Sequence, residues 1–204
     1  MTTASAARYQ SGFFRRYLVL AFLTGFGYLF QVCAMPYIKI GGVSPNLLFA
    51  VIGIVTVAYG KLRAFWVGAL YGLLMQIMVP SVSYLNLGIY TVSTLFCSFP
   101  FADKPLKTLE YDRAINRTRT ELPAWLRTVL CAMLNTFVYE VVNLTYVYIS
   151  GISLTGAHIF RGFLDVLLTG VLTLLLAFPV RRLIFGRRLN APVMKTAPVV
   201  FKRA

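Results

Sequence analysis

Six apolar runs of roughly membrane length follow one another along the chain, and they constrain its fold more than any other feature. An α-helix needs about 20 apolar residues to cross the hydrocarbon core of a bilayer. Hydrophobic residues make up 58% of the chain and charged residues 13%, which places it outside the range of soluble globular proteins. We therefore predict an all-α integral membrane protein with six transmembrane helices. The predicted spans cover residues 17–35, 44–59, 64–79, 84–101, 125–149 and 159–184.

The distribution of Lys and Arg predicts on which side of the membrane each loop lies. If the six helices alternate, one set of loops holds Arg8, Arg15, Arg16, Lys61, Arg63, the loop at 102–123 and the residues from Arg181 onward. The other set holds only Lys39 and Arg161. Because basic residues concentrate in cytoplasmic loops, both termini are predicted to be cytoplasmic. The chain is therefore predicted to be a multi-pass membrane protein.

This topology divides the chain into a cytoplasmic tail at 1–16, a six-helix transmembrane domain at 17–185 and a basic cytoplasmic tail at 186–204. Topology also accounts for the net charge of +14, so no nucleic-acid partner is needed to explain it. Basic residues at helix ends attract anionic membrane lipids.

A signal peptide ending at "VCA", 32–34, is the alternative for the first run, which is longer than a usual signal core and carries Gln31.

Few residues in this chain could support catalysis or metal binding. Cys33, Cys97 and Cys131 lie in three different predicted spans, so they form neither a disulfide framework nor a metal-binding pair and are interpreted as packing residues. His158 is the only histidine. No P-loop, HExxH or GxSxG motif occurs. We therefore expect a protein that is not an enzyme and holds no cofactor and no metal.

Small residues line one face of the third predicted span. Gly68 and Gly72 are four residues apart, which lets another helix approach closely, and Gln76 continues the same face with an amide that needs a hydrogen-bond partner. This face could pack against the chain's own helices or bind a partner protein. The preceding span is predicted to begin with Ser44 as its cap and Pro45 in its first turn.

Ionisable residues inside membrane spans are costly and usually face a polar group or a cavity. Glu140 and Asn143 lie in the fifth predicted span, and Arg161 and Asp165 lie near the start of the sixth. Arg161 and Asp165 are four residues apart, so they could pair on one helix face. This intramembrane polar cluster is predicted in the outer half of the membrane. It would be either a polar clasp between two helices or a pocket open to the outside.

Three motifs resemble the bacterial rod shape-determining protein MreD family. They are "SPNLL" at 44–48, "YGKLRA" at 59–64 and "GALYGLLMQ" at 68–76. The chain length, the six predicted spans and the cytoplasmic termini agree with this family. Members commonly carry an acidic residue where this chain has Gln76, and a Gly-rich turn where it has "PSVSYLN" at 80–86, so the chain resembles a divergent member.

The resemblance implies a multi-pass protein of the bacterial cytoplasmic (inner) membrane, a non-enzymatic scaffold of the machinery that builds the lateral cell wall during elongation. The implied partners are a single-span MreC-like protein, an MreB-like filament, a RodA-like glycosyltransferase and a class B penicillin-binding protein. The candidate partner-interface residues are Gly68, Gly72, Gln76, Ser44, Pro45 and Asn46.

The alternative is a substrate-binding S component of an energy-coupling-factor vitamin transporter, whose size, span number and overall fold are similar. Ala21 and Gly25 in the first span give the small-residue step at which such components meet their coupling subunit. In this interpretation the polar cluster would line a vitamin pocket.

Overall fold

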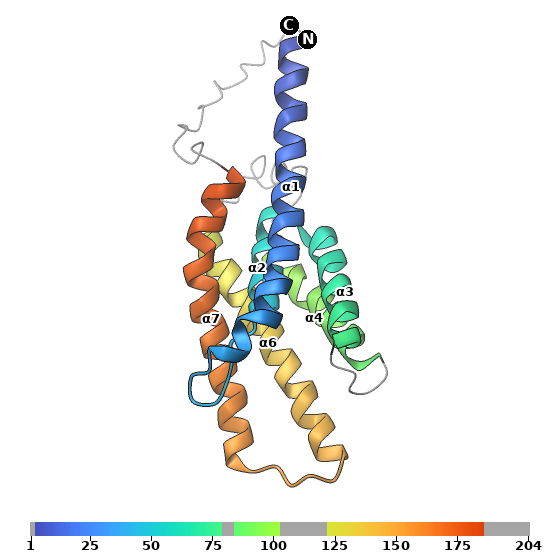
Figure 1. Cartoon of the computed structure of the whole chain (residues 1–204), viewed down its shortest axis with the longest axis vertical. Helices are drawn as coiled ribbons and strands as arrows, with labels where there is room; N and C mark the ends of the chain where they lie inside the picture. Colours follow the sequence, from blue (N-terminus) through green and yellow to red (C-terminus); the bar gives the residue numbers. More distant parts are fainter. Residues whose placement is uncertain (1–2, 79–83, 103–121, 186–204) are drawn as a thin grey trace, which may run out of the picture.

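The computed structural model describes residues 3–78, 84–102 and 122–185, and these residues form helices joined by short connections (Figure 1). The elements are α1 (Thr3–Cys33), the 3-10 helix η1 (Met35–Tyr37), α2 (Leu47–Tyr59), α3 (Lys61–Met78), α4 (Leu85–Phe101), α6 (Ala124–Ile149) and α7 (Gly156–Phe185). Ile40 and Val43 add one isolated β-bridge within the described residues. The all-α prediction is confirmed for this part of the chain.

The helix boundaries differ from the predicted spans at two informative places. Residues 3–16 were predicted as a tail but belong to α1. The helix α2 begins at Leu47, because Asn46 rather than Ser44 caps it: the Asn46 side chain accepts a hydrogen bond from the Leu48 N–H at 3.1 Å. The predicted tail at 186–204 and most of the loop at 102–123 lie outside the described residues.

Three segments are long and apolar enough to cross a membrane, namely Tyr17–Tyr37, Ala124–Ile149 and Gly156–Val180. The helices α2 and α4 are apolar but shorter. With 13 residues, α2 is about 20 Å long, which is less than the roughly 30 Å of a hydrocarbon core. The structure is thus that of a membrane protein, while the full six-span topology stays a prediction.

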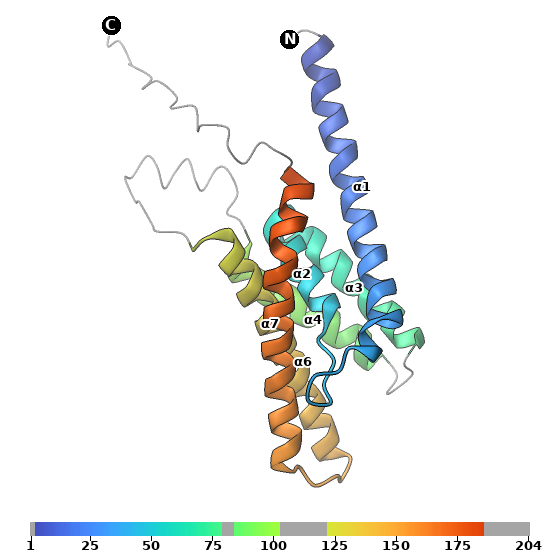
Figure 2. The same ribbon diagram turned by 60° about the vertical axis from the view of Figure 1, so that its left-hand side comes forward.

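The short helix α2 forms the centre of the molecule. Its residues from Leu47 to Val57 are all buried, and it contacts α1, α3, α4, α6 and α7. A helix that is apolar on every side must be covered by protein or by lipid, and the neighbouring helices cover α2. Beside it, the Phe49 ring stacks on Tyr90 of α4 with centroids 4.6 Å apart. Figures 1 and 2 show α1 on the outside of this bundle. The N-terminal end of α1 extends beyond the bundle at the top of both views, and the α6–α7 hairpin extends beyond it at the bottom.

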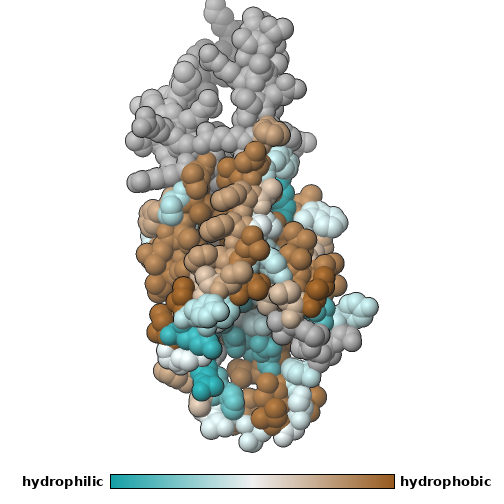
Figure 3. All heavy atoms as spheres, viewed as in Figure 1, coloured by the Kyte–Doolittle hydropathy of each residue, from teal (hydrophilic) through white to brown (hydrophobic). Residues whose placement is uncertain are grey.

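Large apolar side chains cover the outer surface, as the brown spheres in Figure 3 show. Phe22, Trp66, Phe96 and Phe163 are each more than 60% exposed. Exposed apolar side chains on this scale suit contact with lipid rather than water. Inside, several threonines satisfy their hydroxyls by donating to the carbonyl four residues earlier. These are Thr24, Thr56, Thr128, Thr136 and Thr173.

Candidate functional site

Polar side chains from five helices meet at the N-terminal end of α2. We call this group the α2 polar cluster, and its members are Gln31, Asn46, Tyr90, Glu140, Asp165 and Thr169. They come from α1, α2, α4, α6 and α7. The cluster unites two groups of residues that the sequence placed apart, the "SPNLL" motif and the predicted intramembrane acids.

The start of α2 explains why polar groups gather here. The first backbone N–H groups of a helix have no partner within the helix and carry partial positive charge. In this structure the Asn46 N–H donates to the Thr169 hydroxyl at 2.9 Å, and the Leu47 N–H donates to the Gln31 side-chain oxygen at 2.7 Å. With the Asn46 cap on Leu48, three consecutive donors are satisfied by side chains, as a helix end inside an apolar bundle requires.

The two predicted intramembrane acids complete the cluster. The Thr169 hydroxyl donates to Asp165 at 3.2 Å, and the Asp165 carboxyl also lies within hydrogen-bonding reach of Glu140 on α6. Because an ionised carboxylate only accepts hydrogen bonds, a hydrogen bond between two carboxyls requires that one of them carries its hydrogen. Gly162 makes room for this contact, since a Cβ added there would lie 3.3 Å from a Glu140 carboxyl oxygen.

An aromatic group extends the cluster towards α4. The Asn46 amide donates to the Tyr90 hydroxyl at 3.2 Å. Tyr90 lies against Tyr139 of α6, with ring centroids 5.7 Å apart, and the Asn143 side chain lies close to the Tyr139 hydroxyl. Asn143 therefore joins the cluster indirectly.

The prediction for Arg161 is wrong. Within the described residues it forms no ion pair with Asp165, which instead contacts Thr169, Glu140 and the Asn46 backbone. Asp165 is buried while Arg161 is exposed, so the guanidinium extends away from the bundle. A long cationic side chain gains hydration by this orientation, whereas pairing with Asp165 would require it to enter the bundle.

The geometry of the cluster is that of a clasp. It joins α6 to α7 through Glu140 and Asp165, and it also connects α1, α2 and α4 to them. Figure 3 shows hydrophilic residues around a hollow in the lower half of that face, on the side of the molecule where the α6–α7 hairpin lies.

The small-residue face of α3 packs within the chain. A Cβ added to Gly68 would lie 2.9 Å from the Thr94 Cβ, and one added to Gly72 would lie 2.9 Å from the Leu87 Cα, both on α4. The Gln76 side-chain oxygen accepts a hydrogen bond from the Asn86 N–H at 3.1 Å, near the start of α4. A partner protein cannot reach Gly68 or Gly72 without displacing α4, so the partner-interface prediction is wrong for these two glycines, whereas Gln76 is half-buried.

The residues before α2 are not a free interface either. Pro45 and Asn46 are buried, and Ser44 is half-buried. The "SPNLL" motif thus has a structural role at the start of the central helix. It supplies the Asn46 cap and the backbone N–H groups that bond to the polar cluster. The partner-interface prediction for Pro45 and Asn46 is therefore also wrong.

Three members of the cluster were not predicted as site residues. Thr169 lies one helical turn after Asp165, a spacing that could have indicated its role, and Gln31 is a polar residue inside an apolar span. Tyr90 carried no such signal, because tyrosine is common in membrane helices.

The cysteines and the candidate metal ligands lie apart from this cluster. Cys97 and Cys131 are buried, and the Cys131 thiol lies 3.8 Å from the Cys97 carbonyl oxygen, which fits packing residues. In the described part of the chain, no group of three or more His, Cys, Asp or Glu side chains could hold a metal ion. Comparison with protein-family models, curated proteins and solved structures finds no match for this chain.

Proposed function

We propose that this protein is a non-enzymatic membrane scaffold of the bacterial cell-elongation machinery, which binds a single-span MreC-like partner by helix packing. The resemblance of its three motifs to the MreD family supports this function. Each motif has a structural role in the bundle: residues 44–48 begin the central helix, residues 59–64 turn the chain into α3, and residues 68–76 pack α3 on α4. In the turn, Gly60 has a φ of 90°, a conformation that favours glycine.

The observation that carries the proposal is the exposed ridge of α1. Phe22, Phe26 and Phe30 recur every fourth residue, their rings stack at 5.5 and 5.8 Å, and Phe22 and Phe26 are more than half exposed. Beside the ridge runs a wholly apolar groove of about 310 Å³ between α1, α2 and α7. Helices pack with the side-chain ridges of one in the grooves of the other, so a ridge at this spacing beside a groove can receive another helix.

A partner helix is a fitting occupant because of how helices associate in lipid. Lipid tails are as apolar as the helices, so association depends on close packing rather than on the hydrophobic effect. The stacked ridge gives α1 a rigid, shaped surface for such packing. With the α3 glycine face covered by α4, we place the single-span partner on α1.

Affinity purification of the tagged protein from native membranes in mild detergent tests the proposal. Mass spectrometry should identify a single-span MreC-like protein or the wall synthases. The pair Phe22→Ala and Phe26→Ala should reduce recovery of the partner at least tenfold. A matched control, Phe96→Ala with Phe163→Ala, removes two equally exposed rings elsewhere and should leave recovery unchanged. Equal recovery with both pairs would contradict the placement on α1, and recovery of no elongation protein would contradict the function.

The vitamin-transporter S component remains the second candidate, and the hydrophilic hollow near the α6–α7 end favours it. The same purification separates the two functions, because an S component should recover ATPase subunits and a coupling protein instead.

A further inference from the structure

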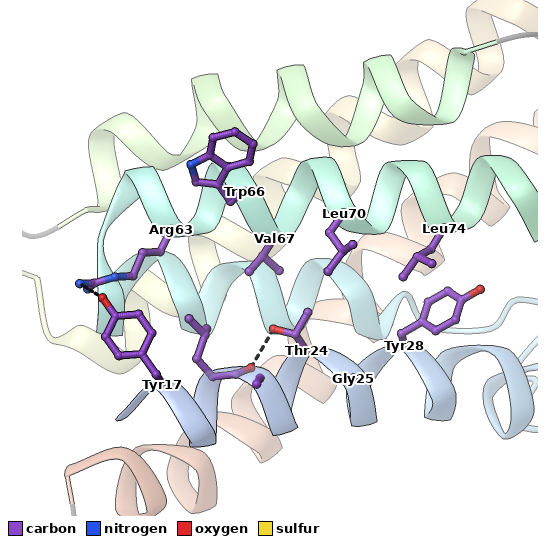
Figure 4. A pocket seen from close by; sticks show the side chains of 11 residues that line it. Tyr17, Thr24, Gly25, Tyr28, Arg63, Trp66, Val67, Leu70 and Leu74 are labelled. Carbon is purple, nitrogen blue, oxygen red and sulfur yellow. Dashed lines mark hydrogen bonds between the residues drawn. The ribbon is translucent and has the colours of Figure 1, made fainter. Parts of the chain in front are cut away.

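A second groove lies between α1 and α3, on a different side of α1 from the Phe ridge. It is an open groove with a volume of about 500 Å³ (Figure 4). Figure 4 shows Tyr17 and Arg63 at one end of it, and Tyr28 and Leu74 at the other. The groove therefore has one cationic end and a long apolar remainder.

The cationic end is built and oriented by its neighbours. The Arg63 guanidinium donates to the Tyr17 hydroxyl at 2.9 Å and to the Tyr59 carbonyl at 3.0 Å, and it lies over the Tyr17 ring. A guanidinium has five N–H donors in a rigid fork, so these two bonds fix its position and leave donors for an anion. Arg63 is exposed, so an anion can approach it.

Away from Arg63 the wall of the groove is mostly apolar, with Leu20, Val67 and Leu70 along it. Thr24 donates its hydroxyl to the Leu20 carbonyl, and the Tyr71 hydroxyl donates to the Thr24 carbonyl. A Cβ added to Gly25 would meet no atom within 4 Å, so the middle of the groove is open. Such walls suit a hydrocarbon chain.

The position and length of the groove match one leaflet of a bilayer. Tyr17 is the first residue of the apolar segment Tyr17–Tyr37, which places Arg63 at the edge of the membrane. From Tyr17 to Tyr28 the helix rises about 16 Å, roughly half of a 30 Å hydrocarbon core. A transmembrane helix crosses both leaflets and would extend beyond the far end of this groove. A phospholipid spans one leaflet only, so its length fits the groove better.

From these features we propose that the α1–α3 groove binds an anionic phospholipid, with its phosphate at Arg63 and one acyl chain along the groove. Basic pockets between membrane helices recognise anionic headgroups in this way. The inference is independent of the proposed scaffold function, because it concerns a different surface and a different ligand.

Quenching of Trp66 by brominated lipids tests this proposal directly. Trp66 lines the groove, and the chain has two tryptophans, so Trp125→Phe leaves Trp66 as the only reporter. The protein is reconstituted in phosphatidylcholine vesicles that contain increasing fractions of acyl-brominated phosphatidylglycerol or acyl-brominated phosphatidylcholine. Half-maximal quenching should occur at about a fivefold lower fraction of phosphatidylglycerol, the ratio that one arginine near the surface provides.

Three variants locate the lipid. Arg63→Gln should abolish the preference, Arg63→Lys should keep most of it, and Gly25→Leu should fill the groove and weaken quenching by both lipids. In the complementary Trp66→Phe protein, Arg63→Gln should leave quenching of Trp125 unchanged. Equal half-quenching fractions for the two lipids, a preference that survives Arg63→Gln, or full quenching after Gly25→Leu would each overturn the proposal.

Discussion

Asn46 is the residue whose replacement should reveal most about the α2 polar cluster. The change Asn46→Ala removes the N-cap of α2, at a cost of about 1 kcal/mol. It also leaves the Tyr90 hydroxyl, which is 1% exposed, without its amide partner, at a cost of about 1 to 3 kcal/mol. The free energy of unfolding should therefore fall by roughly 2 to 4 kcal/mol.

Reversible unfolding in mixed dodecyl maltoside and SDS micelles, followed by circular dichroism, would measure this loss. Ser44→Ala is the matched control, because a helix capped by Asn46 should lose less than about 0.5 kcal/mol when Ser44 changes. Combining Asn46→Ala with Tyr90→Phe removes the orphaned hydroxyl, so the double variant should lose about 1 kcal/mol less than the sum of the single variants. A loss for Ser44→Ala as large as that for Asn46→Ala would refute the assignment of the cap, and strict additivity would refute the contact with Tyr90.

The same unfolding assay tests three further contacts. Gly72→Ala should destabilise by about 1 to 3 kcal/mol because its Cβ meets the α4 backbone, whereas Gly88→Ala, which has open space, should not. Gln76→Ala should cost about 1 kcal/mol, while Gln76→Glu keeps the acceptor at the α4 N-terminus and should be neutral. Glu140→Ala should destabilise by at least about 1 kcal/mol, and Glu140→Gln should retain most of that stability because its amide can donate to Asp165. A neutral Gly72→Ala, a destabilising Gln76→Glu or a neutral Glu140→Ala would contradict the corresponding contact.

The sequence predicted the helices well because a long apolar run indicates a helix that is covered by lipid or protein, whichever of the two covers it. The six predicted spans correspond to the six α-helices of the described residues, with ends that differ by a few residues except at α1. The runs could not indicate whether protein or lipid covers a given helix. In the structure α2 is buried by other helices, whereas many side chains of α1 are exposed.

The site was harder to predict because its contacts join distant parts of the chain. Ser44 and Asn46 both favour N-caps, and the choice of Asn46 depends on Tyr90 and Thr169, which lie 44 and 123 residues away. Arg161 was assigned to Asp165 from helical spacing alone, but spacing does not show which of the two side chains faces the interior.

The structure explains how Gln76 can stand where members of the family that the sequence resembles commonly carry an acid. Here the Gln76 side chain accepts a hydrogen bond from the start of α4, and a carboxylate would accept the same bond with a favourable charge. The departure from the pattern therefore preserves the contact.

The dependence of α2 on α7 has a consequence for how the chain is made. During synthesis α2 leaves the ribosome more than a hundred residues before Thr169, so its first backbone donor has no side-chain acceptor until the last helix arrives. Until then the head of α2 must remain hydrated or held by the insertion machinery, because an unpaired donor in hydrocarbon costs several kcal/mol. A chain truncated before α7 would keep that donor without its side-chain acceptor, so the head of α2 is completed only when the whole bundle has been synthesised.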